Sequence, residues 1–183
     1  IVKYGELTLR ENQIAYAEPG FFRLFDFELL KGDKKTCLSM PGQVVITERI
    51  ARKYFKDEDP IGKIFIFTGA YDKISCEVTG VMKEMPSNSH IHYNFLISYK
   101  SLPKYVQEYW YKHEAYTYVL LDSPERKVEI EKKFPVMAEK YKTDEALKNK
   151  IWGVSLIPLA DIHLTPQVGY EAETKGNRSS MIA

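Results

Sequence analysis

The run Gln43–Tyr93 constrains the fold more than any other part of the sequence. It opens with the β-branched residues Val44–Ile46, which predict a short strand. Thr47 follows directly and has the side chain of a helix N-cap. The next apolar residues recur at helical spacing on one face: Ile50, Ala51, Tyr54 and Phe55. The sequence therefore predicts a strand that leads straight into an amphipathic helix.

The second half of this run indicates further strands joined by turns. Asp59-Pro60 is expected to end the helix, because the residue before a proline disfavours helical geometry. Gly62 then turns the chain into a strand over Ile64–Phe67. A later set of apolar residues alternates with polar ones, as in a strand buried on one face: Ile74, Cys76 and Val78. The turn formers that follow are Pro86, Asn88 and Ser89. This stretch predicts a small β-rich lobe without catalytic machinery.

The N-terminal segment predicts two strands and a short aromatic helix. The strands are expected over Val2–Leu9 and Ile14–Ala17, and Pro19 suits the first turn of a helix. Five apolar side chains of this helix and its continuation are aromatic or large: Phe21, Phe22, Leu24, Phe25 and Phe27. This phenylalanine-rich helix could line a ligand pocket. A core anchor beneath the sheet is the better interpretation, because aromatics at helical spacing are usually buried.

The C-terminal half predicts a strand, a divided helix and a second strand. Tyr116–Leu121 is rich in β-forming residues, and Trp152–Leu159 is the expected second strand. Between them, Ser123-Pro124-Glu125 has the composition of a helix start, with Ser123 as the capping residue. Pro135 is expected to kink or divide the helix that follows. A shorter helix is expected to begin near Ser101 and Pro103. We expect Tyr116–Leu159 to form a strand–helix–strand unit.

Composition excludes some classes of function. The net charge is only +1, from 26 basic and 25 acidic residues, which gives no overall field for nucleic acid or an anionic membrane. No apolar run is long enough for a membrane span, and no signal peptide stands at the start. The chain begins with Ile1 rather than methionine, and we interpret it as a fragment of a longer protein. A natural cytosolic domain stays an alternative.

The two cysteines, Cys37 and Cys76, do not decide the cellular compartment. A disulfide between them would be compatible with an oxidising periplasm. However, Cys76 lies on the inward face of a predicted strand, and buried free cysteine is common. Both states stay open at the level of sequence.

The residues most suggestive of chemistry are His90 and His92, which would share one side of a strand and could bind a metal. A third ligand would have to come from His113, His163 or a distant carboxylate, and no metalloprotease or paired-cysteine spacing is present. The preferred interpretation of this histidine pair is a structural turn. A metal-dependent hydrolase that uses His90 and His92 is the enzymatic alternative.

Other candidate sites are weaker still. Ser87 or Ser89 with His90 lacks the context of a catalytic triad, since neighbours in sequence seldom orient as nucleophile and base. Lys83 has no glycine-rich loop for phosphate. The acidic run Asp57–Asp59 is explained by a solvated turn. We therefore assign no catalytic, cofactor-binding or metal-binding residues, and no cofactor.

Five segments together carry a resemblance to a known family: PGFFRLFDFELLKGD, VVITERIARKYF, DEDPIGK, VTGVMKEMPSNSHIHYNFLIS and SLIPLADIHL. In this order and spacing they resemble the MacB-like periplasmic core domain of FtsX/MacB-type ABC-transporter permeases, in the form common in Bacteroidetes-like sequences. The resemblance implies a periplasmic domain between two membrane spans of an inner-membrane protein. It also implies that this domain is not an enzyme, and that ATP is hydrolysed by a separate cytoplasmic subunit or domain.

The predicted fold class is α+β with two subdomains. Residues 1–40 and 116–175 are expected to form a discontinuous, porter-like βαβ lobe, in which Ile14–Ala17, Tyr116–Leu121 and Trp152–Leu159 share one sheet. Residues 41–115 are expected to form an inserted β-rich lobe, which the resemblance implies is Sabre-like. Residues 176–183 are expected to be a loose tail that leads towards a membrane span.

The expected function is to couple ATP-driven motion to the docking of a partner or to the export of a substrate. The resemblance implies three kinds of partner: a cognate ABC ATPase, a second permease subunit, and a periplasmic adaptor or lipoprotein. We expect the isolated chain to be a monomer or a weak dimer, with a sheet edge near Val2–Leu9 open to a neighbour. A free-standing periplasmic binding module is the other alternative.

Overall fold

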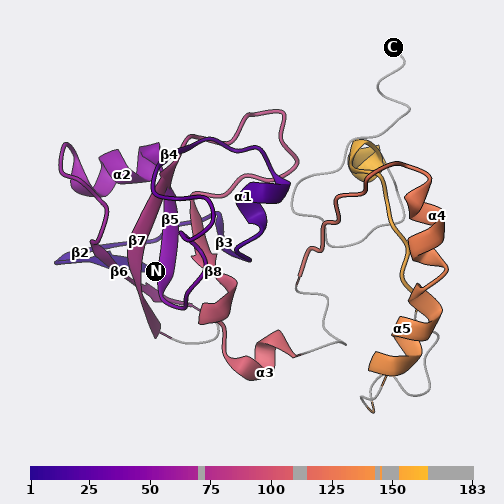
Figure 1. The fold of residues 1–183 in the computed structure, drawn as a ribbon. Helices are drawn as coiled ribbons and strands as arrows, with labels where there is room; N and C mark the ends of the chain where they lie inside the picture. The colour runs from indigo at the N-terminus through magenta and orange to yellow at the C-terminus, as the bar shows by residue number, and fades with distance from the viewer. Residues whose placement is uncertain (70–72, 109–114, 143–144, 146–152, 165–183) are drawn as a thin grey trace. The chain divides into compact units, whose positions relative to one another are not determined.

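A computed structural model describes residues 1–69, 73–108, 115–142, 145 and 153–164 of the chain (Figure 1). The chain divides into two compact units, Ile1–Gln107 and Glu108–Ala183. Within the described ranges, no helix has both the length and the apolar character that crossing a membrane requires.

The first unit is built on one mixed sheet of eight strands. In chain order these are β1 (Val2–Tyr4), β2 (Leu7–Leu9), β3 (Ile14–Ala17), β4 (Leu29–Lys31), β5 (Gln43–Thr47), β6 (Ile64–Thr68), β7 (Lys73–Met82) and β8 (Phe95–Ser98). In space the order is β2-β1-β6-β7-β5-β8-β3, and β4 pairs with β7 beside this path. The prediction that the domain mixes helices and strands is confirmed.

Strand β5 leads directly into a helix, as the sequence predicted. β5 pairs in parallel with β7 and antiparallel with β8. Thr47 caps helix α2 (Glu48–Phe55), since its side chain accepts a hydrogen bond of 3.4 Å from the backbone N–H of Ile50. Ile50, Tyr54 and Phe55 are all buried. The helix ends at Phe55, before Asp59-Pro60, because Lys56 has a φ of 55° and cannot continue it.

The main core lies between α2 and the sheet and is largely aromatic. The ring of Phe65 lies 4.9 Å from that of Tyr54, 5.4 Å from that of Phe55 and 5.8 Å from that of Phe95. These contacts are edge-to-face, the geometry that aromatic quadrupoles favour. The core draws residues from both ends of the sheet, including Val2 of β1 and Ile14 of β3.

The other face of the sheet is covered by the turns of residues 33–40. Val45 alternates with the core residues of β5 and so faces this side, where it is fully buried. Cys37 and Leu38 are buried as well. The segment is fixed by side chains of the sheet: the hydroxyl of Thr79 donates to the carbonyl of Cys37 at 2.6 Å, and that of Ser98 donates to the carbonyl of Leu38 at 2.9 Å.

Val2–Leu9 is a hairpin rather than the single strand that its sequence predicted. β1 and β2 pair antiparallel, and Gly5 and Glu6 form the two-residue turn between them. The apolar residues alternate on each side of Gly5, but the phase shifts by one residue between Tyr4 and Leu7. This shift marks a two-residue turn, because residues three apart then lie opposite each other on one face of the sheet. β2 thereby becomes the outermost strand at one end of the sheet.

The remaining helices of the first unit are short. They are α1 (Phe21–Leu24), a 3₁₀ helix over Tyr99–Ser101, and α3 (Lys104–Gln107). α1 confirms the helix predicted after Pro19, and α3 confirms the one predicted near Ser101 and Pro103. Tyr109 and Trp110, expected on the apolar face of the latter helix, lie outside the described residues.

In the second unit the structure describes α4 (Arg126–Glu131), α5 (Phe134–Tyr141) and a 3₁₀ helix (Leu159–Leu164). Pro135 lies in the first turn of α5, so the predicted division of the helix is confirmed. Ser123 does not act as the N-cap: Glu125 occupies that position, and no side chain caps the helix.

The prediction that Ile14–Ala17, Tyr116–Leu121 and Trp152–Leu159 share a sheet is wrong. Residues 116–121 and 153–158 form no strand, and Trp152 lies outside the described residues. Ile14–Ala17 pairs instead with β8, in parallel. Strands from before and after Met40 thus belong to one sheet, in which β5 lies between β7 and β8. None of the described strands pairs with residues 116–121, and Leu120 is 75% exposed.

Candidate functional site

The most elaborate loop of the first unit is Lys83–Asn94, which connects β7 to β8 and is here called the β7–β8 loop. It is folded on itself: the N–H of Ser89 donates to the carbonyl of Pro86 at 2.9 Å, and the N–H of Ile91 donates to the hydroxyl of Ser89 at 3.2 Å. Met85 and Ile91 are buried and anchor it to the body of the unit. Buried anchors and internal hydrogen bonds give the loop one defined shape.

Asn94, the last residue of this loop, joins three elements. Its side-chain oxygen accepts a hydrogen bond of 2.6 Å from the guanidinium of Arg49 on α2. Its side-chain nitrogen donates to the side chain of Gln13, just before β3, at 3.0 Å. Its backbone carbonyl accepts from the N–H of Thr47 at 3.0 Å. The side chain is 7% exposed, so these bonds replace nearly all of its contact with water.

Two ion pairs hold the start of the loop. Glu84 accepts from the backbone N–H of Arg49 at 2.8 Å and lies 3.6 Å from its guanidinium. The N–H of Arg49 belongs to the first turn of α2 and has no partner within the helix, so this carboxylate satisfies it. The ammonium group of Lys83 lies 3.2 Å from a carboxylate oxygen of Glu28. The loop is therefore fastened at both ends.

The two histidines that the sequence suggested as metal ligands contact different residues. Residues 90–93 are not part of a strand. The Nε2 atom of His92 lies 3.0 Å from the carbonyl oxygen of Pro86, which makes it a donor within the loop. The ring of His90 lies 5.9 Å from that of Phe25. His113 and the side chain of His163 lie outside the described residues. Among the residues that are described, no group of three or more His, Cys, Asp or Glu is arranged to hold a metal ion.

The other candidate residues take structural roles. Asp59 accepts from the N–H of Ile61 at 3.2 Å and pairs with Lys31 at 3.0 Å, which confirms that the acidic run forms a turn. Lys31 is the largest cause of the lowered pKa of Asp59, followed by the backbone hydrogen bond. The hydroxyl of Ser89 is engaged by the N–H of Ile91, as described above.

The phenylalanines around α1 form a separate aromatic group, here called the phenylalanine cluster: Phe21, Phe22, Phe25 and Phe27. The ring of Phe21 lies 5.2 Å from Phe22, 5.1 Å from Phe25 and 5.7 Å from Phe27. Only Phe22 is buried, and the other three are half-buried. The predicted core anchor is thus confirmed for Phe22. The cluster lies next to the β7–β8 loop through the contact of Phe25 with His90.

Both cysteines are free and buried. Burial raises the pKa of the Cys37 thiol to about 11; a backbone hydrogen bond acts in the opposite direction, and the charge of Asp33 adds to the rise. Burial alone raises the pKa of the Cys76 thiol to about 12. Neither side chain has the lowered pKa of a reactive cysteine.

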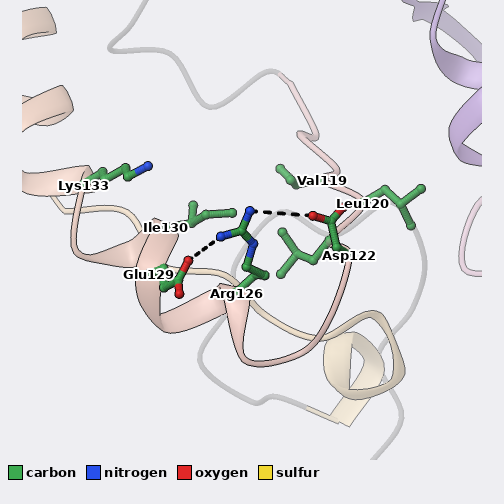
Figure 2. Close-up of a pocket in the computed structure, with 8 residues that line it drawn as sticks. Val119, Leu120, Asp122, Arg126, Glu129, Ile130 and Lys133 are labelled. Carbon is green, nitrogen blue, oxygen red and sulfur yellow. Dashed lines mark hydrogen bonds and ion pairs between the residues drawn. The ribbon is translucent and has the colours of Figure 1, made fainter.

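A pocket of about 260 Å³ lies in the second unit, between residues 119–122 and α4 (Figure 2). Arg126 points into it but is engaged by two carboxylates, at 2.6 Å from Glu129 and 3.7 Å from Asp122. All three charged side chains are more than half exposed to solvent. An arginine already neutralised on both sides has little capacity left for an anion, so the pocket does not indicate a ligand.

The sequence alone did not single out Arg49, Glu84 or Asn94. All three lie inside two of the segments that carry the family resemblance, VVITERIARKYF and VTGVMKEMPSNSHIHYNFLIS. The signal that could have found Asn94 is its position directly before the apolar run Phe95–Ser98, where an amide must be hydrogen-bonded to be buried.

Comparisons with known proteins agree with the resemblance. The family model of the MacB-like periplasmic core domain matches residues 1–135. A domain of a protein assigned as a permease in Porphyromonas gingivalis superposes with a TM-score of 0.61 at 22% identity, over 79% of this chain and 66% of that chain. The periplasmic region of MacB from Actinobacillus actinomycetemcomitans superposes with a TM-score of 0.52 at 15% identity, over 82% of this chain and 72% of that chain.

At these identities the two structures show a shared fold. The chain spans just under two thirds of the length of the Porphyromonas domain. No curated protein matches the sequence.

Proposed function

Because the chain belongs to the family of MacB-like periplasmic core domains, we propose that it couples ATP-driven motion of an ABC-transporter permease to partner docking or to substrate export. The observation that carries this proposal is the match of the family model over residues 1–135, which include the whole eight-stranded sheet. The domain is periplasmic, and its family is generally non-catalytic.

The β7–β8 loop is the element we propose for transmitting the motion. It is fastened to α2 through Arg49 and to the start of β3 through Gln13, so a displacement of the loop is passed to both. Coupling between distant parts of a protein requires such packed and hydrogen-bonded connections. A loop without these bonds could move without moving α2 or β3.

The proposed partners follow from the permease assignment. A cognate ABC ATPase supplies the hydrolysis of ATP, and a second permease subunit completes the transporter. A periplasmic adaptor or lipoprotein is the proposed docking partner on the outer side. None of these roles calls for a catalytic residue in this domain.

We also propose that the chain holds two subdomains, but with a division near Gln107 in place of the boundaries at Met40 and Ala115. This is supported by the sheet, which takes strands from both sides of Met40, and by the two compact units. If so, the fragment 1–107 should fold by itself and unfold cooperatively in urea. Absence of far-UV circular dichroism typical of a β-sheet in that fragment would contradict this division.

The coupling proposal is tested by distance measurements in the complete permease bound to its ATPase. A spin label is attached to Asp57→Cys, at an exposed position just after α2. The native Cys37 and Cys76 should escape labelling, because both thiols are buried and their pKa values are raised. Pulsed electron paramagnetic resonance then gives the distance between the labels of two permease subunits.

The expected result is a change in this distance distribution when ATP binds. The control is the same labelled permease with an ATPase whose phosphate-binding lysine is replaced, in which no change is expected. A distribution that is the same with and without ATP, in a complex that hydrolyses ATP normally, would refute coupling through this domain.

The hydrolase alternative has its own test. Purified chain is expected to contain no stoichiometric transition metal and to hydrolyse neither esters nor peptides. One bound metal per chain that is lost in both His90→Ala and His92→Ala would overturn the proposed non-catalytic role.

A further inference from the structure

Strand β2 leaves an open edge at one end of the sheet. It pairs with β1 on one side, and no described strand pairs with it on the other. Residues 5–8 are exposed, including Leu7, a large apolar side chain that is 42% exposed. Figure 1 shows β2 at the periphery of the first unit. Exposed edge strands are sites where another strand can add.

The hairpin fixes which backbone groups of β2 face outward. Tyr4 and Leu7 are directly opposite each other and flank a two-residue turn, so they exchange hydrogen bonds with each other. Hydrogen-bonded and non-bonded pairs alternate along an antiparallel ladder. Lys3 and Thr8 are therefore a non-bonded pair, and the N–H and carbonyl of Thr8 point away from β1. A partner strand must bond to Thr8.

The charges on both sides of Thr8 select the partner. The sequence here is Glu6-Leu7-Thr8-Leu9-Arg10, which has opposite charges at equal distances from the central threonine. In an antiparallel pair centred on Thr8, Leu7 of each copy lies opposite Leu9 of the other. Glu6 and Arg10 flank the strand, so Glu6 of each copy then lies beside Arg10 of the other. Opposite charges and apolar pairs across strands stabilise a sheet.

We infer that β2 pairs with β2 of a second copy of this chain, in antiparallel orientation, with Thr8 opposite Thr8 on a two-fold axis. Such a contact is isologous, since the same surface serves on both copies. It would join two eight-stranded sheets into one and cover Leu7. Within the described part of the chain, Glu6 and Arg10 take part in no ion pair, so both charges are available for it.

The opposite edge of the sheet does not offer this complementarity. β3 is half-buried or buried along its length, in contrast to β2. The residues next to it, Gln13 and Glu18, carry a single charge between them, so a self-pair would bring no opposite charges together. The inference is thus specific to β2, and it does not depend on the proposed function.

Charge reversal tests the pairing with the 183-residue chain in sedimentation velocity over a range of concentrations. Glu6→Arg and Arg10→Glu should each weaken association at least about tenfold, because both symmetric pairs become repulsive. An equimolar mixture of the two variants should associate again, since the arginine introduced in one then lies opposite the glutamate introduced in the other. The chain with both reversals should associate like the native chain.

Thr8 provides a second measurement that tests the register. Under mild oxidation Thr8→Cys should form a symmetric disulfide dimer, because opposite residues of a bonded pair are about 5.5 Å apart at Cα, within disulfide range. Leu7→Cys, the matched control one position away, should cross-link less. Thr8→Pro should abolish association without unfolding the domain, since the N–H it removes points outward.

A native chain that stays monomeric at all concentrations, or single reversals that associate as well as the native chain, would overturn the inference. Cross-linking of Leu7→Cys in preference to Thr8→Cys would overturn the register. None of these results bears on the coupling experiment, which depends on ATP and the whole permease.

Discussion

Replacing Asn94 by alanine tests whether one side chain fixes the β7–β8 loop to the rest of the unit. The substitution removes the hydrogen bond from Arg49, at 2.6 Å, and the one to Gln13, at 3.0 Å. The backbone bonds of Asn94 stay in place, because alanine has the same N–H and carbonyl. The change thus isolates the side chain.

The expected loss of stability follows from these two bonds. A hydrogen bond with a charged group contributes about 1.5–3 kcal/mol and a neutral one about 0.5–1.5 kcal/mol. For the bond from Arg49 we take the lower end of its range, about 1.5 kcal/mol. The side chain of Arg49 is 59% exposed, so water can replace the partner that it loses. The sum is about 2–3 kcal/mol. Asn88→Ala, an exposed asparagine of the same loop, should change stability by less than about 0.5 kcal/mol.

Urea unfolding followed by far-UV circular dichroism measures these differences. Tryptophan fluorescence would not report on the first unit, because Trp110 and Trp152 both lie outside Ile1–Gln107. A double-mutant cycle with Arg49→Ala should give a coupling energy of about 1 kcal/mol. The reasoning is refuted if Asn94→Ala is no more destabilising than Asn88→Ala, or if the cycle gives no coupling.

Two further predictions concern the backbone and the thiols of the first unit. Gly32→Ala would place a Cβ 2.4 Å from the carbonyl oxygen of Thr79 at a φ of +95°, and it should cost about 2–4 kcal/mol. Gly69→Ala meets nothing within 4 Å and should be nearly neutral; equal urea midpoints for the two variants would contradict the prediction. Thiol reagents at neutral pH should leave Cys37 and Cys76 unmodified in the folded chain and modify both in urea, and rapid labelling of the folded chain would show that they are accessible. Since burial raises their pKa values from 9.0 to about 11 and about 12, the unfolded chain loses these protons first; stability should therefore fall as pH rises from about 9 to 12, as pH-dependent urea midpoints would reveal.

The sequence predicted those parts of the fold that depend on neighbouring residues. The cap at Thr47 and the apolar face of α2 are local features, and both are confirmed. The same is true of the division of the helix at Pro135, where the ring prevents a continuous helix whatever surrounds it.

Predictions that depended on distant partners were less successful. Tyr116–Leu121 has strong β propensity but forms no strand, because a strand also needs a neighbour with which to exchange hydrogen bonds. The sequence of β5 likewise does not show that this strand lies between β7 and β8. Its apolar residues indicate only that both faces of the strand are buried.

The candidate site shows the same limit. The sequence suggested His90 and His92 as candidates because of their side-chain chemistry. The hydrogen bonds that join the β7–β8 loop to the rest of the unit are instead made by Gln13, Arg49 and Asn94, which come from three separate parts of the chain. Such a network becomes apparent only when three elements are placed in space. The family resemblance located two of its segments without indicating what they do.

The order of strands has a geometric consequence for the link between β2 and β3. These strands lie at opposite ends of a path of seven, yet only residues 10–13 separate them in the sequence. An extended link from Leu9 to Ile14 reaches about 17 Å, whereas six strand spacings in a flat sheet would require about 29 Å.

The sheet must therefore curl, so that the short link of residues 10–13 can connect β2 to β3. Glu11 within this link is bonded to α2: its carboxylate accepts hydrogen bonds from the ammonium group of Lys53 at 2.6 Å and from the hydroxyl of Tyr54 at 2.8 Å. The short connection between β2 and β3 therefore limits how flat this sheet can be. Lengthening the connection would let β2 and β3 move apart and would expose the aromatic core between α2 and the sheet to water.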